Sequence, residues 1–236
     1  MVAALYASHF ILIYPYGIFS IRMPLFNPAD STSHAITLEG VVFPAGSKVE
    51  FQKESLWTEH PVSAVAPHPI NAGSLRIRSL DKQRDSTLSV GLATAQSIEG
   101  WTCSAAQPAY FSVGRGANGG PSTWRLSSCR LIDGVRQAGS SWPAGTIVSR
   151  TIENSIEKWL VSWPGNSASP ETWCNETLTV DGYKLSSFFG SYDKQHRLET
   201  WDGTACRRRA NGQDDYVRIE KLGPHRFKET KVSAVD

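Results

Sequence analysis

Tryptophan and cysteine are the residues of this chain whose types and spacing could do chemistry. Half of the tryptophans lie within a few residues of a cysteine. The tryptophans are Trp101, Trp124, Trp173 and Trp201, and the cysteines are Cys103, Cys129, Cys174 and Cys206. A flat indole face can stack on a sugar ring or an aliphatic ligand at little cost in ordering entropy. The sequence therefore predicts a ligand-binding face at these tryptophans, with packing against disulfides in the core as the alternative.

The two cysteine segments share a pattern: each returns through Thr-Trp, four residues and Cys-Arg. Four cysteines allow three pairings, and the shared pattern selects Cys103 with Cys129 and Cys174 with Cys206. Such bonds persist mainly in oxidising surroundings. The pairing therefore predicts an extracytoplasmic location: secreted, periplasmic or membrane-anchored. Four reduced, buried cysteines in a cytosolic protein are the alternative.

Carboxylates could support a different function. A glycosidase needs two carboxyl groups that face each other across a groove. The candidates are Glu99, Asp133, Glu171, Asp181, Glu199 and Asp202. No spacing brings any two of them together, and acids in turns are usually solvated. A carbohydrate-active enzyme on a β scaffold is therefore the second hypothesis, behind binding without catalysis.

Other motifs point away from metals, phosphates and nucleic acids. The histidines lack the spacing of metal ligands, and no Cys-x-x-Cys pair occurs. Gly114–Gly120 lacks the ending of a phosphate loop and predicts a flexible hairpin tip. Arg207–Arg209 could grip a phosphate or sulfate, but Asp214 and Asp215 favour a solvated basic turn. With a net charge of only +2, we expect no cofactor and no nucleic-acid partner.

The residues named above lie in or near copies of a strand–turn–strand unit. The sequence shows this unit most clearly at Ile36–Phe51. Its sequence of an apolar residue, an acidic residue and glycine recurs along the chain. A glycine after an acidic residue is typical of a turn, because glycine takes a positive φ without steric cost. The copies are Leu38-Glu39-Gly40, Ile98-Glu99-Gly100, Ile132-Asp133-Gly134 and Val180-Asp181-Gly182. Phe43-Pro44-Ala45-Gly46-Ser47 also returns as Trp142-Pro143-Ala144-Gly145-Thr146. The pattern predicts an all-β fold of mostly antiparallel hairpin units with irregular internal repeats.

The segments between these units follow ordinary periodicity. Leu75–Leu80, Thr87–Leu92 and Tyr216–Glu220 alternate as strands. The proline-rich His60–Gly73 predicts a loop. Thr151–Trp163 places Ile152, Ile156, Trp159, Leu160 and Trp163 at helical spacing, which predicts the one short helix of the chain. A strand over residues 158–163 is the competing interpretation.

Residues 2–21 form the most apolar stretch and contain no Asp, Glu, Lys or Arg. Their length suits a membrane-spanning segment, but Pro15 and Gly17 interrupt it, and no basic residue precedes it as in a signal peptide. A membrane anchor or atypical signal, an over-extended start before Met23, and a buried strand pair are the three interpretations.

The predicted organisation has five parts. They are an apolar segment at 1–22, a linker at 23–35, a hairpin region at 36–95, a β region at 96–227 with Cys/Trp modules at 98–130 and 172–209, and a loose tail at 228–236. Low charge, at 19% of residues, suits a protein outside the cytoplasm. We expect a non-catalytic protein that binds a glycan or cell-surface polymer or serves in surface structure, with membrane contact only through the N-terminal segment.

Overall fold

The computed structural model describes residues 10–14, 17–21, 31–53, 59–83, 86–114, 123–163, 177–208, 214–223 and 226–232. These residues form strands and turns without a helix, so the predicted all-β class is confirmed. A hairpin of β1 (Phe10–Tyr14) and β2 (Gly17–Ile21) precedes the main body. Within the described ranges there is no helix long and apolar enough to span a membrane.

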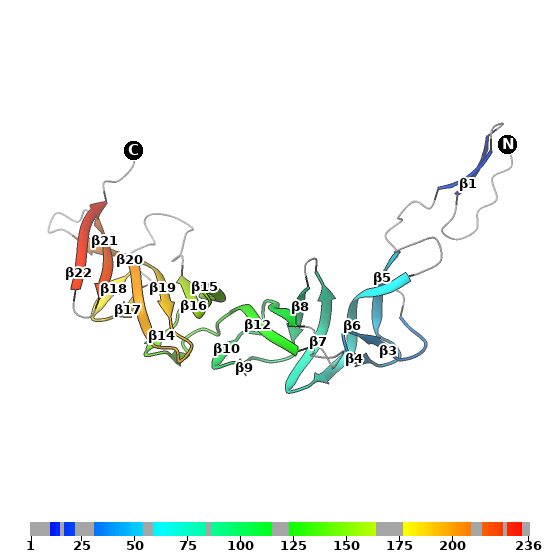
Figure 1. Cartoon of the computed structure of the whole chain (residues 1–236), viewed down its shortest axis with the longest axis horizontal. Coiled ribbons are helices and arrows are strands. Elements are labelled where there is room, and N and C mark those ends of the chain that lie inside the picture. The colour runs from blue at the N-terminus through cyan, green and yellow to red at the C-terminus, as the bar shows by residue number, and fades with distance from the viewer. Residues whose placement is uncertain are drawn as a thin grey trace.

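The main body is one antiparallel sheet whose strands are neighbours in the order in which the chain makes them. They are β5 (Lys48–Lys53), β6 (Glu59–Ala72), β7 (Leu75–Lys82), β8 (Thr87–Leu92), β11 (Ala109–Gly114), β12 (Thr123–Arg130), β15 (Ile147–Glu153), β16 (Ile156–Trp163), β19 (Ser187–Tyr192), β20 (Leu198–Arg208), β21 (Asp214–Gly223) and β22 (Arg226–Val232). The result is an elongated molecule with β5 towards one end and β22 at the other (Figure 1).

Short two-stranded hairpins interrupt this series, and we call them cap hairpins. They are β3 (Ile36–Leu38) with β4 (Val41–Phe43), β9 (Gln96–Ile98) with β10 (Trp101–Cys103), β13 (Arg136–Gln137) with β14 (Ser140–Ser141), and β17 (Leu178–Val180) with β18 (Tyr183–Leu185). One hydrophobic core joins the buried residues of the cap hairpins to those of the sheet. The cap hairpins therefore supply the second layer that an amphipathic sheet needs.

The acid-Gly pairs form the tips of three cap hairpins. Glu39, Glu99 and Asp181 have φ of 48°, and the glycine after each has φ between 81° and 85°. Two central residues with positive φ define the type I′ turn, whose twist matches that of the flanking strands. The fourth pair, Asp133-Gly134, is a turn that leads into β13, whose own hairpin turn is Ala138-Gly139.

The Pro-Ala-Gly turns also share one geometry. The Ser47 hydroxyl donates to the Pro44 carbonyl at 2.7 Å, and the Thr146 hydroxyl donates to the Pro143 carbonyl at 2.8 Å. Ser47 and Thr146 are fully buried, so these bonds satisfy hydroxyls that water cannot reach. The first of these turns connects β4 of a cap hairpin to β5 of the sheet, and the second connects β14 to β15.

The predicted helix at Thr151–Trp163 is wrong. Residues 147–163 form the β15–β16 hairpin, closed by Asn154 and Ser155 with φ of 51° and 64°. Trp159, Val161 and Trp163 are buried in alternation, while Ile152 and Ile156 are exposed. The competing strand at 158–163 is therefore correct. Asn154 and Ser155 form a type I′ turn, and every second side chain from Trp159 to Trp163 is buried, which is the pattern of a strand and not of a helix.

Two other expectations also change. The predicted loop at His60–Gly73 is mostly strand β6, whose register against β7 shifts between Val65 and Ile70. Pro67 and Pro69 lie in this bulged part, where a missing N–H costs no ladder bond. The predicted loose tail begins inside β22, which pairs with β21 as far as Val232; the other domain boundaries remain predictions.

The Cys103–Cys129 disulfide is present, with the two Cα atoms 5.7 Å apart. It links β10 of a cap hairpin to β12 of the sheet, and both cysteines are buried. This confirms the first predicted pairing. Cys206 is also disulfide-bonded, while Cys174 lies outside the described residues, so the second pairing remains a prediction.

Candidate functional site

A groove of about 820 Å³ lies between the first two cap hairpins and the sheet. Its lining residues come from the β3–β4 tip, the β6–β7 turn, the β9–β10 tip, β11 and β12. The lining residues are Glu39, Gly40, Val41, Val42, Asn71, Ala72, Gly73, Ser74, Leu75, Ser97, Ile98, Glu99, Phe111 and Trp124. Its size is in the range of small-molecule sites.

Trp124 gives the groove an aromatic surface. Its side chain is partly exposed, and its ring centroid lies 6.0 Å from that of the buried Phe111. Val42, 61% exposed, adds an apolar surface from the β3–β4 hairpin. Asn71, Ser74 and Ser97 bring amide and hydroxyl groups to the same groove. An aromatic face beside hydrogen-bonding groups is the arrangement that a sugar ring requires.

The four tryptophans of the predicted ligand face have different surroundings. Trp101 and Trp201 are buried, at 0% and 4% exposure, so their rings pack in the core. Trp124 lines the groove, and Trp173 lies outside the described residues. The Trp201 indole N–H donates to the Asp181 carboxylate at 2.9 Å. Among the predicted tryptophans that lie in the described ranges, Trp124 therefore remains as the candidate for ligand binding.

The two carboxylates at the groove already have partners. Glu39 pairs with Lys82 at 2.8 Å. Glu99 accepts a hydrogen bond from the backbone N–H of Leu126 at 2.8 Å and pairs with the guanidinium of Arg150. Each carboxylate thus ties a cap-hairpin tip to the sheet. The groups at the groove that carry no charge are aromatic, apolar and neutral polar side chains.

The other candidate carboxylates do not form a facing pair with free groups. Asp181 pairs with Lys221 at 2.9 Å, Asp202 with Arg218 at 2.8 Å, and Glu199 with Lys158 at 3.4 Å. Glu171 lies outside the described residues. Asp133 lines a separate pocket. The candidates are therefore distributed along the molecule.

A cluster of titratable and aromatic side chains meets the β9–β10 hairpin at Gly100 and Trp101. His196 stacks on Trp101, with ring centroids 4.6 Å apart, and meets the edge of Trp159 at 6.1 Å. Burial lowers the pKa of His196, against the opposing charge of Asp193. Burial, aided by Asp181, raises the pKa of Tyr192 far above its usual value. Trp101, Trp159 and Tyr192 are buried in the core, and His196 is partly exposed.

Arg150 completes that cluster. Its guanidinium carbon lies 4.9 Å from the centroid of the Trp159 ring, a cation–π contact. Burial lowers the pKa of Arg150, while the Glu157 carboxylate, 3.1 Å away, opposes that shift. Glu99 and Glu157 together neutralise this mostly buried cation, which is the condition for keeping a charge inside a protein.

Sequence reasoning missed most of the groove. Val42, Asn71 and Ser74 are distant from Trp124 in sequence and carry no motif, so no local signal could join them. Within the described part of the chain, no cluster of three or more His, Cys, Asp or Glu side chains could hold a metal. The chain matches no protein-family model, no curated protein and no solved structure.

Proposed function

We propose that this chain is a non-catalytic, extracytoplasmic binding protein whose Trp124 groove takes a sugar ring of a glycan. The observation that carries the proposal is the partly exposed Trp124, which lines a groove of about 820 Å³. Trp124 supplies the stacking face, and Asn71, Ser74 and Ser97 supply hydrogen bonds to sugar hydroxyls.

The proposed location rests on the Cys103–Cys129 disulfide. A buried disulfide is consistent with an oxidising compartment. Internal repetition is part of the same proposal. The matching type I′ tips at Glu39, Glu99 and Asp181, and the matching turns at Pro44 and Pro143, support a repeated unit that places binding surfaces between successive cap hairpins.

The alternative, a carbohydrate-active enzyme, has weaker support. A glycosidase acid must reach the scissile oxygen, opposite a second free carboxyl group. Glu39 and Glu99 line the groove but pair with Lys82 and Arg150. In these pairs neither carboxyl group is free to act on a substrate.

A calorimetric titration with soluble gluco-, chito- and xylo-oligosaccharides tests the proposal. We expect at least one series to bind the wild-type chain. Trp124→Ala should weaken that binding by about tenfold or more, because the stacking face is lost. Trp124→Phe should retain part of the affinity, because a smaller aromatic face remains.

Tyr110→Ala is the matched control. Tyr110 is an exposed aromatic residue on β11, next to β12, but it does not line the groove. Equal loss of affinity in both alanine variants, or none in Trp124→Ala, would contradict the proposed site. Release of shortened sugars during the titration, detected by chromatography, would favour the enzyme.

A further inference from the structure

The charged side chains at the Trp124 groove all have the same sign. Of the described residues that line the groove, Glu39 and Glu99 alone carry a charge, and both are carboxylates. Each lies at the tip of a different cap hairpin. Their cationic partners, Lys82 and Arg150, do not line the groove. Both ion pairs therefore present their negative member to a ligand.

The two ion pairs differ in which member water can reach. The Glu99 side chain is 32% exposed, whereas that of Arg150 is 9% exposed and is held over the Trp159 ring. In the other pair the order is reversed, because the Lys82 side chain is 49% exposed and that of Glu39 only 19%. Lys82 can therefore screen its carboxylate, while Arg150 stays behind Glu99. Glu99 is the stronger source of negative potential in the groove.

The Glu99 carboxylate also keeps some capacity to accept hydrogen bonds. Its Oε1 accepts from the backbone N–H of Leu126 at 2.8 Å, and its Oε2 pairs with Arg150. An ionised carboxylate offers about four lone-pair positions, so these two contacts leave about half of them for a ligand. Such an oxygen binds an ammonium group more strongly than a neutral hydroxyl, because the hydrogen bond joins opposite charges.

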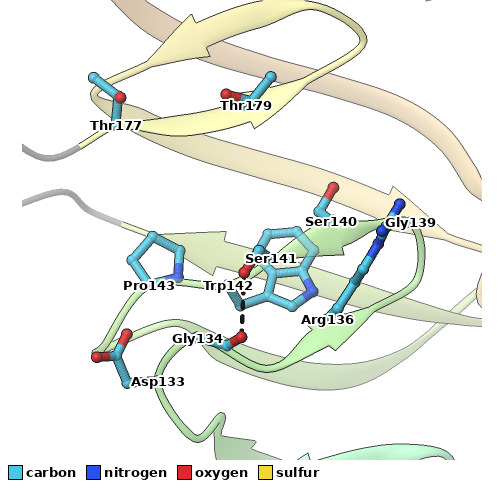
Figure 2. Close-up of a pocket in the computed structure, with 10 residues that line it drawn as sticks. All are labelled: Asp133, Gly134, Arg136, Gly139, Ser140, Ser141, Trp142, Pro143, Thr177 and Thr179. Carbon is cyan, nitrogen blue, oxygen red and sulfur yellow. Dashed lines mark hydrogen bonds between the residues drawn. The ribbon is translucent and has the colours of Figure 1, made fainter.

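The pocket of about 480 Å³ between the third and fourth cap hairpins lacks this arrangement. Figure 2 shows Asp133 and Arg136 at opposite ends of that pocket, with the Asp133 oxygens turned away from it. Its lining therefore includes charges of both signs. Trp142 also lines the pocket but is fully buried, so its ring cannot stack on a ligand. We expect charge selection at the Trp124 groove and not at this pocket.

We propose that Glu99 makes the Trp124 groove select sugars by charge, so that amino sugars with an ammonium group bind most tightly and acidic sugars least. This inference rests on the proposed function, since it concerns the same groove. Trp124 can stack on the ring of any of these sugars, so the charged substituent sets the order. The whole chain carries a net charge of +2, and a general attraction to the protein would therefore give the opposite order.

Calorimetric titration of the full chain with three tetrasaccharides of the same linkage tests the inference. They are cellotetraose, which is neutral, its glucosamine counterpart and its glucuronic acid counterpart. At about pH 6 the amines are protonated and the carboxylic acids ionised. We expect the glucosamine sugar to bind about threefold to fivefold more tightly than cellotetraose, and the glucuronic acid sugar about threefold to fivefold more weakly, the effect of an exposed pair of charges. High salt should shrink both differences.

Three variants assign the selectivity to its residue. Glu99→Gln removes the charge but keeps an oxygen that can accept from the Leu126 N–H, and it should lose most of the discrimination among the three sugars. Glu39→Gln should lose less, because Lys82 already screens that carboxylate. Glu157→Gln is the matched control: Glu157 pairs with the same Arg150 at 3.1 Å but does not line the groove. It should discriminate as the wild type does.

Failure of the inference is distinguishable from failure of the proposed function. Equal affinities for the three sugars, or tightest binding of the acidic one, would overturn charge selection while cellotetraose binding still supports a sugar site. Equal loss of discrimination in Glu157→Gln and Glu99→Gln would also overturn it, because the effect would then come from Arg150. If none of the three sugars binds, the inference is wrong, and the other neutral oligosaccharides decide the proposed function separately.

Discussion

Gly100 shows how closely single residues determine this fold. Its φ is +85°, and a Cβ there would lie 2.2 Å from Cε1 of His196. His196 reaches this point from the loop between β19 and β20 and stacks on Trp101. Two segments far apart in the sequence therefore meet over a glycine, and only glycine fits both the turn and the stacked ring.

Gly100→Ala should consequently destabilise the protein more than Gly40→Ala. Gly40 has nearly the same φ, +81°, in the same Glu-Gly turn, but nothing lies within 4 Å of its added Cβ. Both variants incur the left-handed backbone cost of about 1–2 kcal/mol. Gly100→Ala should cost about 1–3 kcal/mol more, as overpacking does. Urea unfolding measures both.

His196→Ala in the Gly100→Ala background should recover most of that difference, because the clashing ring is gone. If the two glycine variants lose equal stability, the stacking of His196 over Gly100 is not the native arrangement.

His196 also predicts a pH dependence. Burial lowers its pKa from 6.5, although the charge of Asp193 opposes the shift. Asp193 also pairs with Arg197 on the same loop. The unfolded chain therefore binds a proton more readily than the folded one. Folding stability should fall as the pH drops below about 6.5.

Chemical unfolding at about pH 8 and about pH 5 checks this. His196→Gln should reduce the loss of stability on acidification, while His68→Gln, which changes an exposed histidine on β6, should not. An unchanged pH slope in His196→Gln would mean that another group causes the acid sensitivity.

At the scale of elements, the β15–β16 hairpin marks the limit of the sequence analysis. Ile152, Ile156, Trp159 and Trp163 satisfy a helical stripe, but the same segment also alternates from Trp159 to Trp163. The deciding residues are Asn154 and Ser155, which take positive φ. Their turn signal is weaker than that of Asn-Gly, so the sequence pattern favours a helix.

Ser155→Gly distinguishes the hairpin from a helix. In the hairpin, glycine removes the left-handed strain of Ser155 and should stabilise the protein by about 1 kcal/mol. In a helix, the same change would cost about 0.5 kcal/mol or more. Thermal unfolding gives the sign. Ser155→Ala is the control: it should give no gain in the hairpin, whereas a gain there with a loss for glycine would indicate a helix.

Other elements were predictable because their signals are local. The acid-Gly pairs at 39–40, 99–100 and 181–182 fix hairpin tips through backbone φ alone. The Cys103–Cys129 bond followed from a matched pattern. The ion pair of Glu99 with Arg150, and the meeting of Val42 with Trp124 in one groove, depend on strand order, which no local pattern encodes. Trp124 and Glu99 were therefore visible as candidates in the sequence, and their assembly with the rest of the groove was not.

At the scale of the whole molecule, the described strands form one long sheet, and the cap hairpins cover one of its faces. The face away from the cap hairpins has a row of mostly hydroxyl side chains that runs across neighbouring strands. Cross-strand pairing joins Asp81, Ser89, Tyr110, Ser128, Ser149, Leu160, Ser191 and Thr200 in this row. Antiparallel sheets tolerate such a solvated face, so the elongated sheet of Figure 1 needs no second full layer.

Cap hairpins line two of the concave sites, including the Trp124 groove, and a third lies on the sheet strands themselves. The central claim is that a sugar binds on the cap-hairpin side, at Trp124. The most direct measurement is an amide NMR titration of the chain with the tightest-binding oligosaccharide. The account predicts saturable shifts at Val42, Gly73 and Ser97 around the groove, with none at Ser149, Ser162 or Ser191 on the hydroxyl-rich face. Shifts confined to those three serines would contradict it.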